Sequence, residues 1–476
     1  MKIICLFLLL LCVPAAVADG LPDLGEVSQT VMSPQDEQRI AEEILRDVAT
    51  SGAVVNDVEV VDYLQNLGMR LAANSSDNRQ PFTFFVVQDP SINAFAMPGG
   101  VIGVHTGLIT SATSESELAS VLAHEIGHVT QRHLARMVAQ QRQNAWQSFA
   151  AMAFALLAAR SNPQLAGASM QAAQAGAIQR QLDYTREHER EADRVGLQIL
   201  DQAGFDTRAM PLFFEQLMKG TRFYENGAPT FLRTHPLTTE RIADVKNRVE
   251  QLPFRQVIDS PQFHYVRAKL RATEGRPQQA IEWFEANLRE KRYGFEAAQH
   301  YGLALALLRA NQMERARAEM NWLNANTARH PMIENLAAQL EFAAGNPRVA
   351  GQKFQRALSL FPSQRGLIYG YAELLLATGQ PDGALKLLDE KQSQYPHDPR
   401  LYTLKSQAYT MQGRDLLRHQ AQGEAYYYSF NVPAAIEQLE LALKSGDGDF
   451  YQLSIVEARL KQLRQMLADA DKKTGG

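Results

Sequence analysis

Five consecutive residues, His124-Glu125-Ile126-Gly127-His128, form the pattern HExxH. The stretch has helical periodicity, and residues at i and i+4 lie on one face of a helix, so both imidazoles can reach one zinc ion. Glu125 is rotated about 100° from His124, beside the metal, where it can take a proton from zinc-bound water. The pattern predicts a hydrolytic zinc site, and two unrelated surface histidines are the alternative.

A site of this kind needs a third protein ligand and an open fourth position for water. The candidates lie in the strongly helical segment 187–193, EHEREAD. Glu189 and Asp193 share a helix face, so Glu189 could bind the metal while Asp193 orients His124 or His128. We expect the other two acids of the segment on a solvated face with nearby arginines: Glu187 and Glu191, paired with Arg186, Arg190 or Arg194.

Two downstream residues could act at the same centre, in the stretches Thr234-His235-Pro236 and Arg241-Ile242. His235 could stabilise a developing oxyanion, or fill the open zinc position as a latch that a substrate or partner displaces, or be a structural histidine. It is therefore a candidate for both the catalytic residues and the metal ligands. Arg241 could stabilise an oxyanion or anchor the loop, with a structural ion pair as the alternative.

The elements around these residues predict a mainly α-helical domain with a small β-sheet. Helix start signals, apolar periodicity and β-rich runs give the following expected elements: helices from Ser33 to about Ala49, over Val58–Ala73 and over Ser114–Met137, and a strand over Pro81–Val87. Asn93–Ile109, broken by Pro98-Gly99-Gly100, suggests a hairpin or an edge strand. This edge could hold an extended substrate by β-augmentation, and an ordinary hairpin turn is the alternative.

A short apolar segment, Ala145–Ala159, is followed by an Ala- and Gln-rich helix to about Arg180. It is too short to span a membrane. Two interpretations stay open: a buried or capping helix pair, or a mobile lid or membrane-facing hairpin over the site.

From about Phe263 the chain becomes helix upon helix with a regular period. Turn residues recur every 34 positions, at Asn311, Gly345, Gly379 and Gly413, and Gly275 precedes Asn311 by 36. Five residues after each of the first four turns lies an alanine: Ala280, Ala316, Ala350 and Ala384. This is the period of tetratricopeptide (TPR) repeats, whose stacked helix pairs present a concave binding face. Five tyrosines could line that face or serve packing: Tyr369, Tyr371 and Tyr426-Tyr427-Tyr428.

Residues 1–18 read as a secretory signal peptide with small residues before a cleavage site after Ala18; a signal anchor is the alternative. Cys5 and Cys12 both lie in it, so the mature chain would have no cysteine, which excludes disulfides and thiol catalysis. The 476 residues carry 48 Lys+Arg against 52 Asp+Glu, which gives no reason to expect a nucleic-acid partner. Export without cysteine fits a bacterial periplasm.

The motifs between Asn93 and Ile242 resemble those of the HtpX/CAAX-protease-type zinc metallopeptidases, although the transmembrane helices of HtpX-type members are missing. The motifs are HEIGH, EREAD, the upstream NAFAMPGG of residues 93–100, and the downstream stretches at 234–236 and 241–242. With the signal peptide and the TPR array, the whole chain resembles the periplasmic β-barrel assembly-enhancing proteases. The resemblance implies His124, His128 and Glu189 as zinc ligands, Glu125 as general base and Asp193 as their support.

The sequence therefore predicts four segments: signal peptide 1–18, a gluzincin-like zinc metallopeptidase domain 19–258, an α-solenoid of TPR repeats 259–468 and a disordered tail 469–476. The expected protein is a zinc endopeptidase of the periplasm with one zinc per chain. The resemblance implies misassembled outer-membrane β-barrel proteins as substrates, the β-barrel assembly machinery as a partner through the TPR array, and possible peripheral association with the membrane. The alternative is a TPR chaperone or assembly factor with a latched or structural zinc site.

Overall fold

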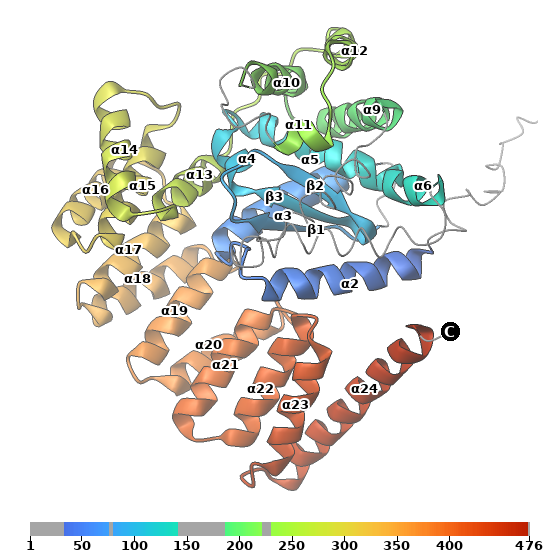
Figure 1. The fold of residues 1–476 in the computed structure, drawn as a ribbon. Coiled ribbons are helices and arrows are strands. Elements are labelled where there is room, and N and C mark those ends of the chain that lie inside the picture. The colour runs from blue at the N-terminus through green and yellow to red at the C-terminus, as the bar shows by residue number, and fades with distance from the viewer. Residues whose placement is uncertain (1–32, 76–79, 141–185, 221–229, 475–476) are drawn as a thin grey trace, which may run out of the picture.

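The computed structural model describes residues 33–75, 80–140, 186–220 and 230–474. The predictions for the signal peptide and for segment 145–180 lie outside these residues. Within them the chain is mainly helical, with one small sheet followed by an array of helix pairs (Figure 1). The predicted fold class is confirmed.

The sheet has three strands in the order β1-β3-β2. They are β1 (Thr83–Val87), β2 (Ala94–Met97) and β3 (Val101–His105), with β1 parallel and β2 antiparallel to β3. A single turn, η1 (Pro98–Gly100), joins β2 to β3, so the predicted hairpin is confirmed and β2 lies at the sheet edge. Gly99 and Gly100 have φ of 72° and 77°, and a Cβ on either would overlap the backbone of Glu37 or Pro81. These glycines therefore serve the close packing of the turn itself.

Alternating strand residues pack against helices on opposite faces of the sheet. Phe85 and Val87 face α2 (Pro34–Thr50), whereas Phe84 and Val86 join the core of α3 (Val58–Ala72) and α5 (Glu115–Thr130). The predicted starts of α2 and α3 are confirmed, since Ser33 and Asp57 accept hydrogen bonds from the first-turn N–H groups.

The helix predicted over Ser114–Met137 is wrong in one respect, because it is two helices. α5 ends at Thr130, and α6 (His133–Gln140) begins after Arg132, whose φ is 53°. The Arg132 guanidinium lies 2.7 Å from the Glu37 carboxylate on α2. Arg132 thus adopts the left-handed conformation that glycine usually takes, and its ion pair with Glu37 holds it there. The apolar periodicity of the sequence does not indicate this break.

The described residues before α13, called the catalytic part because they carry the HExxH pattern, contain five further helices: α4 (Thr106–Ser111), α9 (Arg186–Gln202), α10 (Ala209–Gly220), α11 (Thr230–Thr234) and α12 (Thr239–Val249). α9 packs along α5, and α12 packs on both α9 and α10. Figure 1 shows α9, α10, α11 and α12 stacked on the side of α5 away from α2.

The second half consists of paired helices that curve around the catalytic part (Figure 1). They are α13 (Pro261–Thr273), α14 (Pro277–Glu290), α15 (Glu296–Arg309), α16 (Met313–Asn326), α17 (Pro331–Ala343), α18 (Pro347–Leu360), α19 (Arg365–Ala377), α20 (Pro381–Gln392), α21 (Pro399–Gln412), α22 (Asp415–Tyr428), α23 (Val432–Lys444) and α24 (Phe450–Thr474). The predicted turn residues all have positive φ, from 58° at Asn311 to 80° at Gly345. The four predicted alanines are buried, and the repeat prediction is confirmed.

The C-terminal helix and the five tyrosines of the array can be compared with the sequence analysis. α24 continues to Thr474, so the described part of the predicted disordered tail is helical, in keeping with the helix-forming Ala468 and Ala470. The five tyrosines contact other helices of the array, as packing predicts: the Tyr369 hydroxyl donates to Asp398, Tyr371 accepts from Gln355, and Tyr428 stacks on Tyr402.

Helix α3 of the catalytic part lies against the array. The Lys269 ammonium on α13 is 2.5 Å from the carboxylates of both Asp57 and Glu59. Glu59 also accepts from the Asn335 amide on α17 at 2.8 Å, and Arg365 on α19 pairs with Asp62. Three array helices therefore contact one helix of the catalytic part, two through a charged side chain and one through an amide.

Among the described residues, none of the helices combines the length and apolar character needed to cross a membrane.

Candidate metal centre

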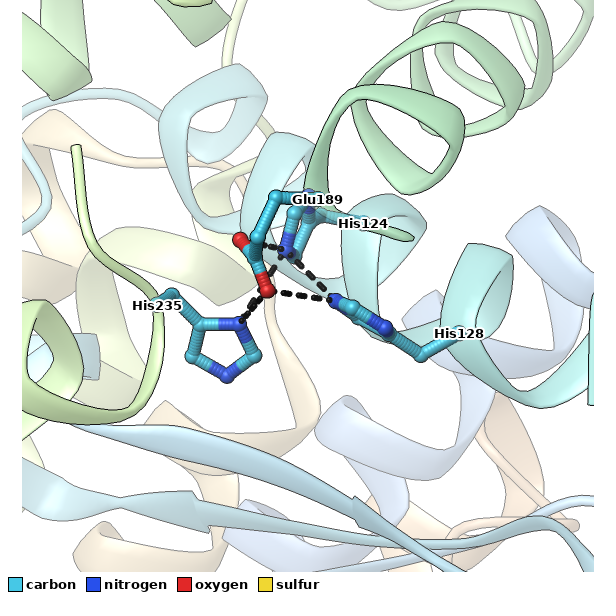
Figure 2. Close-up of side chains that lie close together, drawn as sticks. All are labelled: His124, His128, Glu189 and His235. Atoms are coloured by element: carbon cyan, nitrogen blue, oxygen red, sulfur yellow. Dashed lines mark hydrogen bonds and ion pairs between the residues drawn. The ribbon is translucent and has the colours of Figure 1, made fainter. Parts of the chain in front are cut away.

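Four side chains from three separate segments converge inside the catalytic part (Figure 2). His124 and His128 come from α5, Glu189 from α9, and His235 from the loop after α11. One ligand atom of each lies within 4.8 Å of the others, and all four residues are buried. The structure thus brings together every residue that the sequence analysis assigned to the metal.

Glycines allow α5 and α9 to cross closely enough for this convergence. A Cβ on Gly127 would lie 3.0 Å from the Ala192 carbonyl oxygen, and one on Gly196 would lie 3.0 Å from the His124 backbone. Each helix therefore places a glycine against the backbone of the other. This close contact carries the Glu189 side chain to the two histidines.

The donor atoms fit a zinc ion. The Nε2 atoms of His124 and His128 are 3.0 Å apart, and they lie 3.5 and 3.4 Å from the Glu189 carboxylate oxygens. Tetrahedral zinc with bonds of about 2.0–2.1 Å has ligand atoms about 3.3 Å apart. Two imidazoles and a carboxylate are also a common ligand set of catalytic zinc.

His235 occupies the fourth corner of this cluster. Its Nδ1 is 3.0 Å from Glu189 Oε1 and 3.4 Å from His124 Nε2, and its Nε2 is 3.5 Å from Glu125 Oε1. The Phe231 ring stacks on it with the centroids 4.7 Å apart. His235 therefore lies where a water or substrate oxygen would approach, and it also contacts the glutamate of HExxH.

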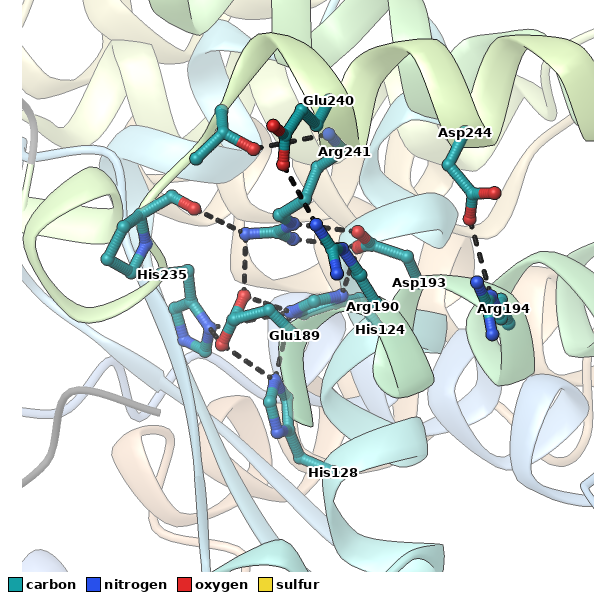
Figure 3. Close-up of polar contacts among 12 residues, drawn as sticks. His124, His128, Glu189, Arg190, Asp193, Arg194, His235, Glu240, Arg241 and Asp244 are labelled. Carbon is teal, nitrogen blue, oxygen red and sulfur yellow. Dashed lines mark hydrogen bonds and ion pairs between the residues drawn. The ribbon is translucent and has the colours of Figure 1, made fainter. Parts of the chain in front are cut away.

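A buried arginine ties the ligand helix to the His235 loop (Figure 3). Arg241 donates to both carboxylate oxygens of Asp193 at 2.8 Å, approaches Glu189 Oε2 at 2.7 Å, and donates to the Pro236 carbonyl at 2.8 Å. Asp193 Oδ1 in turn lies 3.0 Å from His124 Nδ1. Arg241 thus combines the ion-pair and loop-anchoring roles, and Asp193 faces His124 rather than His128.

The electrostatics of the cluster favour a cation. Burial opposes protonation of His124, but Asp193 and Glu189 outweigh it and raise its pKa to about 10. Burial lowers the pKa of His128 to about 3 and raises that of Glu125. The surrounding histidines lower the pKa of Glu189 despite burial, so it is ionised. An anionic carboxylate and a neutral imidazole thus face one centre, as a metal requires.

The sequence analysis missed a second group of residues behind His128. Glu191 was expected to pair with arginines of its own helix, and this is wrong: it contacts His133 at 3.1 Å and Arg136 at 3.0 Å, both on α6. His133 is buried and lies five residues after His128, outside the i+4 spacing that would have linked them in one helix. The break at Arg132 turns the chain so that His133 lies next to His128.

Comparisons with known proteins agree with this geometry. Residues 60–249 match the description "Peptidase family M48", and residues 341–408 match "Tetratricopeptide repeat". A "Beta-barrel assembly-enhancing protease" of Escherichia coli O157:H7 is 32% identical over 455 residues, 94% of this chain and 92% of that protein. A "Putative beta-barrel assembly-enhancing protease" of Vibrio cholerae is 34% identical and covers 91% of each chain. The "Mitochondrial metalloendopeptidase OMA1" of Schizosaccharomyces pombe is 32% identical over 41% of this chain and 54% of its own.

The peptidase match and the His-His-Glu cluster define a zinc metalloendopeptidase that carries a TPR array. Because the similarity to the bacterial relatives extends over nearly the whole length of both chains, the chain belongs to the family of β-barrel assembly-enhancing proteases.

Proposed function

We propose that this chain is a zinc endopeptidase of the bacterial periplasm, with one zinc per chain, that degrades misassembled outer-membrane β-barrel proteins and assists their assembly. The observation that carries the proposal is the buried convergence of His124, His128 and Glu189 with Glu125 beside them. The names of the full-length relatives support the class of substrate. The signal peptide proposed for 1–18 would direct export.

In the proposed reaction His124, His128 and Glu189 hold the metal, and Asp193 orients His124. Zinc, when bound, polarises the scissile carbonyl and makes a coordinated water more acidic. Glu125 accepts the proton of the attacking water and passes it to the leaving amine. Its fully buried position favours this role, because burial raises the pKa of its carboxylate and makes it a stronger base.

The outer strand of the sheet is suited to hold the substrate. β2 packs directly against α5, and its residues Ala96 and Met97 line a pocket that also reaches His128. An extended peptide added to this strand would run past the metal centre with its backbone hydrogen-bonded. We therefore assign β2 as the substrate-binding edge.

His235 acts in this proposal as a latch on the fourth metal position. Its ring lies among the other donors and against Glu125, so water and substrate would enter only after it moves. Displacement by a substrate or a partner would then activate the enzyme. The oxyanion-stabilising role remains the alternative for this residue.

The second half would recruit substrates or dock the enzyme on the barrel-assembly machinery. We place the boundary between the catalytic part and the TPR array at 258/259, before α13, so that α13 and all later helices belong to the array. An α-solenoid offers a long curved surface for extended partners. The network around α3 would hold this surface in a fixed relation to the active site.

The Glu125→Gln variant tests the catalytic assignment. It should keep zinc at the wild-type stoichiometry but lose cleavage of an unfolded outer-membrane protein by about 10²–10⁴-fold, since a general base contributes that much. Glu187→Gln, an exposed residue, is the matched control and should cleave normally. If the wild type shows no metal-dependent cleavage of any unfolded substrate while it still assists folding, the chaperone alternative gains.

A further inference from the structure

A second chain of polar contacts leads from His128 away from the metal centre. His128 Nδ1 lies 2.9 Å from His133 Nδ1, and His133 Nε2 lies 3.1 Å from Glu191 Oε2. The His133 side chain is fully buried, whereas that of Glu191 is 38% exposed and also contacts the Arg136 guanidinium. The chain therefore runs from the buried ligand to the protein surface.

The chemistry of these groups fixes the direction of each hydrogen bond. Glu191 can only accept when ionised, so the proton between it and His133 belongs to His133 Nε2. A neutral imidazole carries one N–H, so His133 Nδ1 must accept, and His128 Nδ1 must donate to it. His128 Nε2 then carries no proton, and its lone pair is directed at His124 and Glu189.

The surroundings keep both groups in the forms that this order requires. The His133 side chain is fully buried and the His188 ring stacks on it with the centroids 4.5 Å apart, an environment that favours the neutral imidazole. Glu191 is partly exposed and lies 3.0 Å from the Arg136 guanidinium, which favours the ionised carboxylate. A neutral histidine therefore lies between His128 and an ionised carboxylate.

The other histidine ligand has the same kind of support in a shorter form. His124 Nδ1 lies 3.0 Å from Asp193, which leaves its Nε2 directed at the cluster. His128 Nδ1 instead lies 2.9 Å from His133, and His133 leads on to the Glu191 carboxylate. Each imidazole is thus backed by a carboxylate, one directly and one through a second imidazole.

We propose that His133 and Glu191 are positioning residues that hold His128 in the tautomer and orientation able to bind the metal. The proposal rests on the zinc site of the proposed function. Groups that orient a metal-binding histidine typically change metal affinity by about 10–100-fold when removed.

The test compares zinc affinity, by competition with a chromophoric chelator, and the visible spectrum of the Co²⁺-substituted full-length protein. His133→Leu removes the acceptor, whereas His133→Asn, of similar size, keeps an oxygen near the position of Nδ1. Glu191→Gln removes only the carboxylate that sets the direction of the hydrogen bonds through His133. Glu187→Gln is its control on an exposed position of the same helix.

For His133→Leu we expect a loss of zinc affinity of about 10–100-fold and an altered Co²⁺ spectrum. Glu191→Gln should lose less zinc affinity. His133→Asn and Glu187→Gln should bind zinc within about threefold of the wild type. Equal affinities of wild type and His133→Leu, or an equal loss in the Leu and Asn variants, would overturn the proposal. If His133→Leu does not fold, equal affinities of Glu191→Gln and Glu187→Gln overturn it. A wild type that binds no zinc instead refutes the proposed function.

Discussion

Replacing Arg241 by methionine removes the guanidinium that contacts both Glu189 and Asp193. Arg241, Glu189 and Asp193 are each about 1% exposed, and the arginine also holds the Pro236 carbonyl next to His235. Methionine has a similar length and leaves the packing nearly intact. The variant therefore isolates the loss of charge and hydrogen bonds at the centre.

The expected cost follows from the two carboxylates that stay behind. Removing one partner of a buried ion pair typically destabilises a protein by about 3–5 kcal/mol, because the remaining charge has no compensation. For a unit of about 150–250 residues, 1 kcal/mol corresponds to about 2–4 °C. The metal-free variant should thus melt roughly 6–20 °C below the metal-free wild type. Excess zinc should recover part of this difference, because the cation neutralises Glu189.

The measurement is thermal unfolding by calorimetry, with and without zinc, and Arg190→Met is the matched control. Arg190 also joins α9 to α12, through Glu240 at 2.9 Å, but the side chains of this pair are 40% and 68% exposed. Such surface pairs contribute about 0–1 kcal/mol. If the two arginine variants melt at the same temperature, Arg241 does not hold the centre together.

Two further predictions concern the latch and the pH dependence of stability. His235→Ala should raise the rate of cleavage of an unfolded substrate, because it clears the fourth position; an unchanged or lower rate contradicts the latch. Burial lowers the pKa of His330 from 6.5 to about 4, and its Nδ1 accepts the Met332 N–H at the start of α17. The unfolded chain therefore binds a proton more readily between these pH values, and the free energy of unfolding should fall by up to about 3 kcal/mol as the pH drops from about 6.5 to 4. His330→Asn, which keeps a capping group, should show a smaller drop in melting temperature over that range.

The parts of the molecule that depend on short sequence intervals were predictable. HExxH places two histidines on one helix face whatever surrounds them, and the sequence therefore predicts that His124 and His128 meet. The turns of the array follow for a similar reason: a left-handed residue such as Gly345 or Gly379 ends each first helix, and a buried alanine follows five residues later. Both signals are local.

The support behind His128 was not predictable, because it depends on a break that no breaker residue marks. Thr130, Gln131 and Arg132 carry neither glycine nor proline, so periodicity favours one continuous helix. In such a helix a residue five positions after His128 would point well away from it. The ion pair between Arg132 and Glu37, 95 positions apart in the chain, accompanies the turn that returns His133 to the site.

The sequence spacing alone also does not decide which glutamate of segment 187–193 reaches the metal centre. Glu187, Glu189 and Glu191 all lie on one helix and have the same chemistry, and their spacing alone gives each a different face. The crossing of α5 and α9 decides which face meets the histidines, and the contacts of Gly127 and Gly196 with the opposite backbones set that crossing. A larger residue at Gly196 would push the helix carrying Glu189 away from His124. These two glycines therefore belong to the metal centre as much as its ligands do, although nothing in their own chemistry points to a metal.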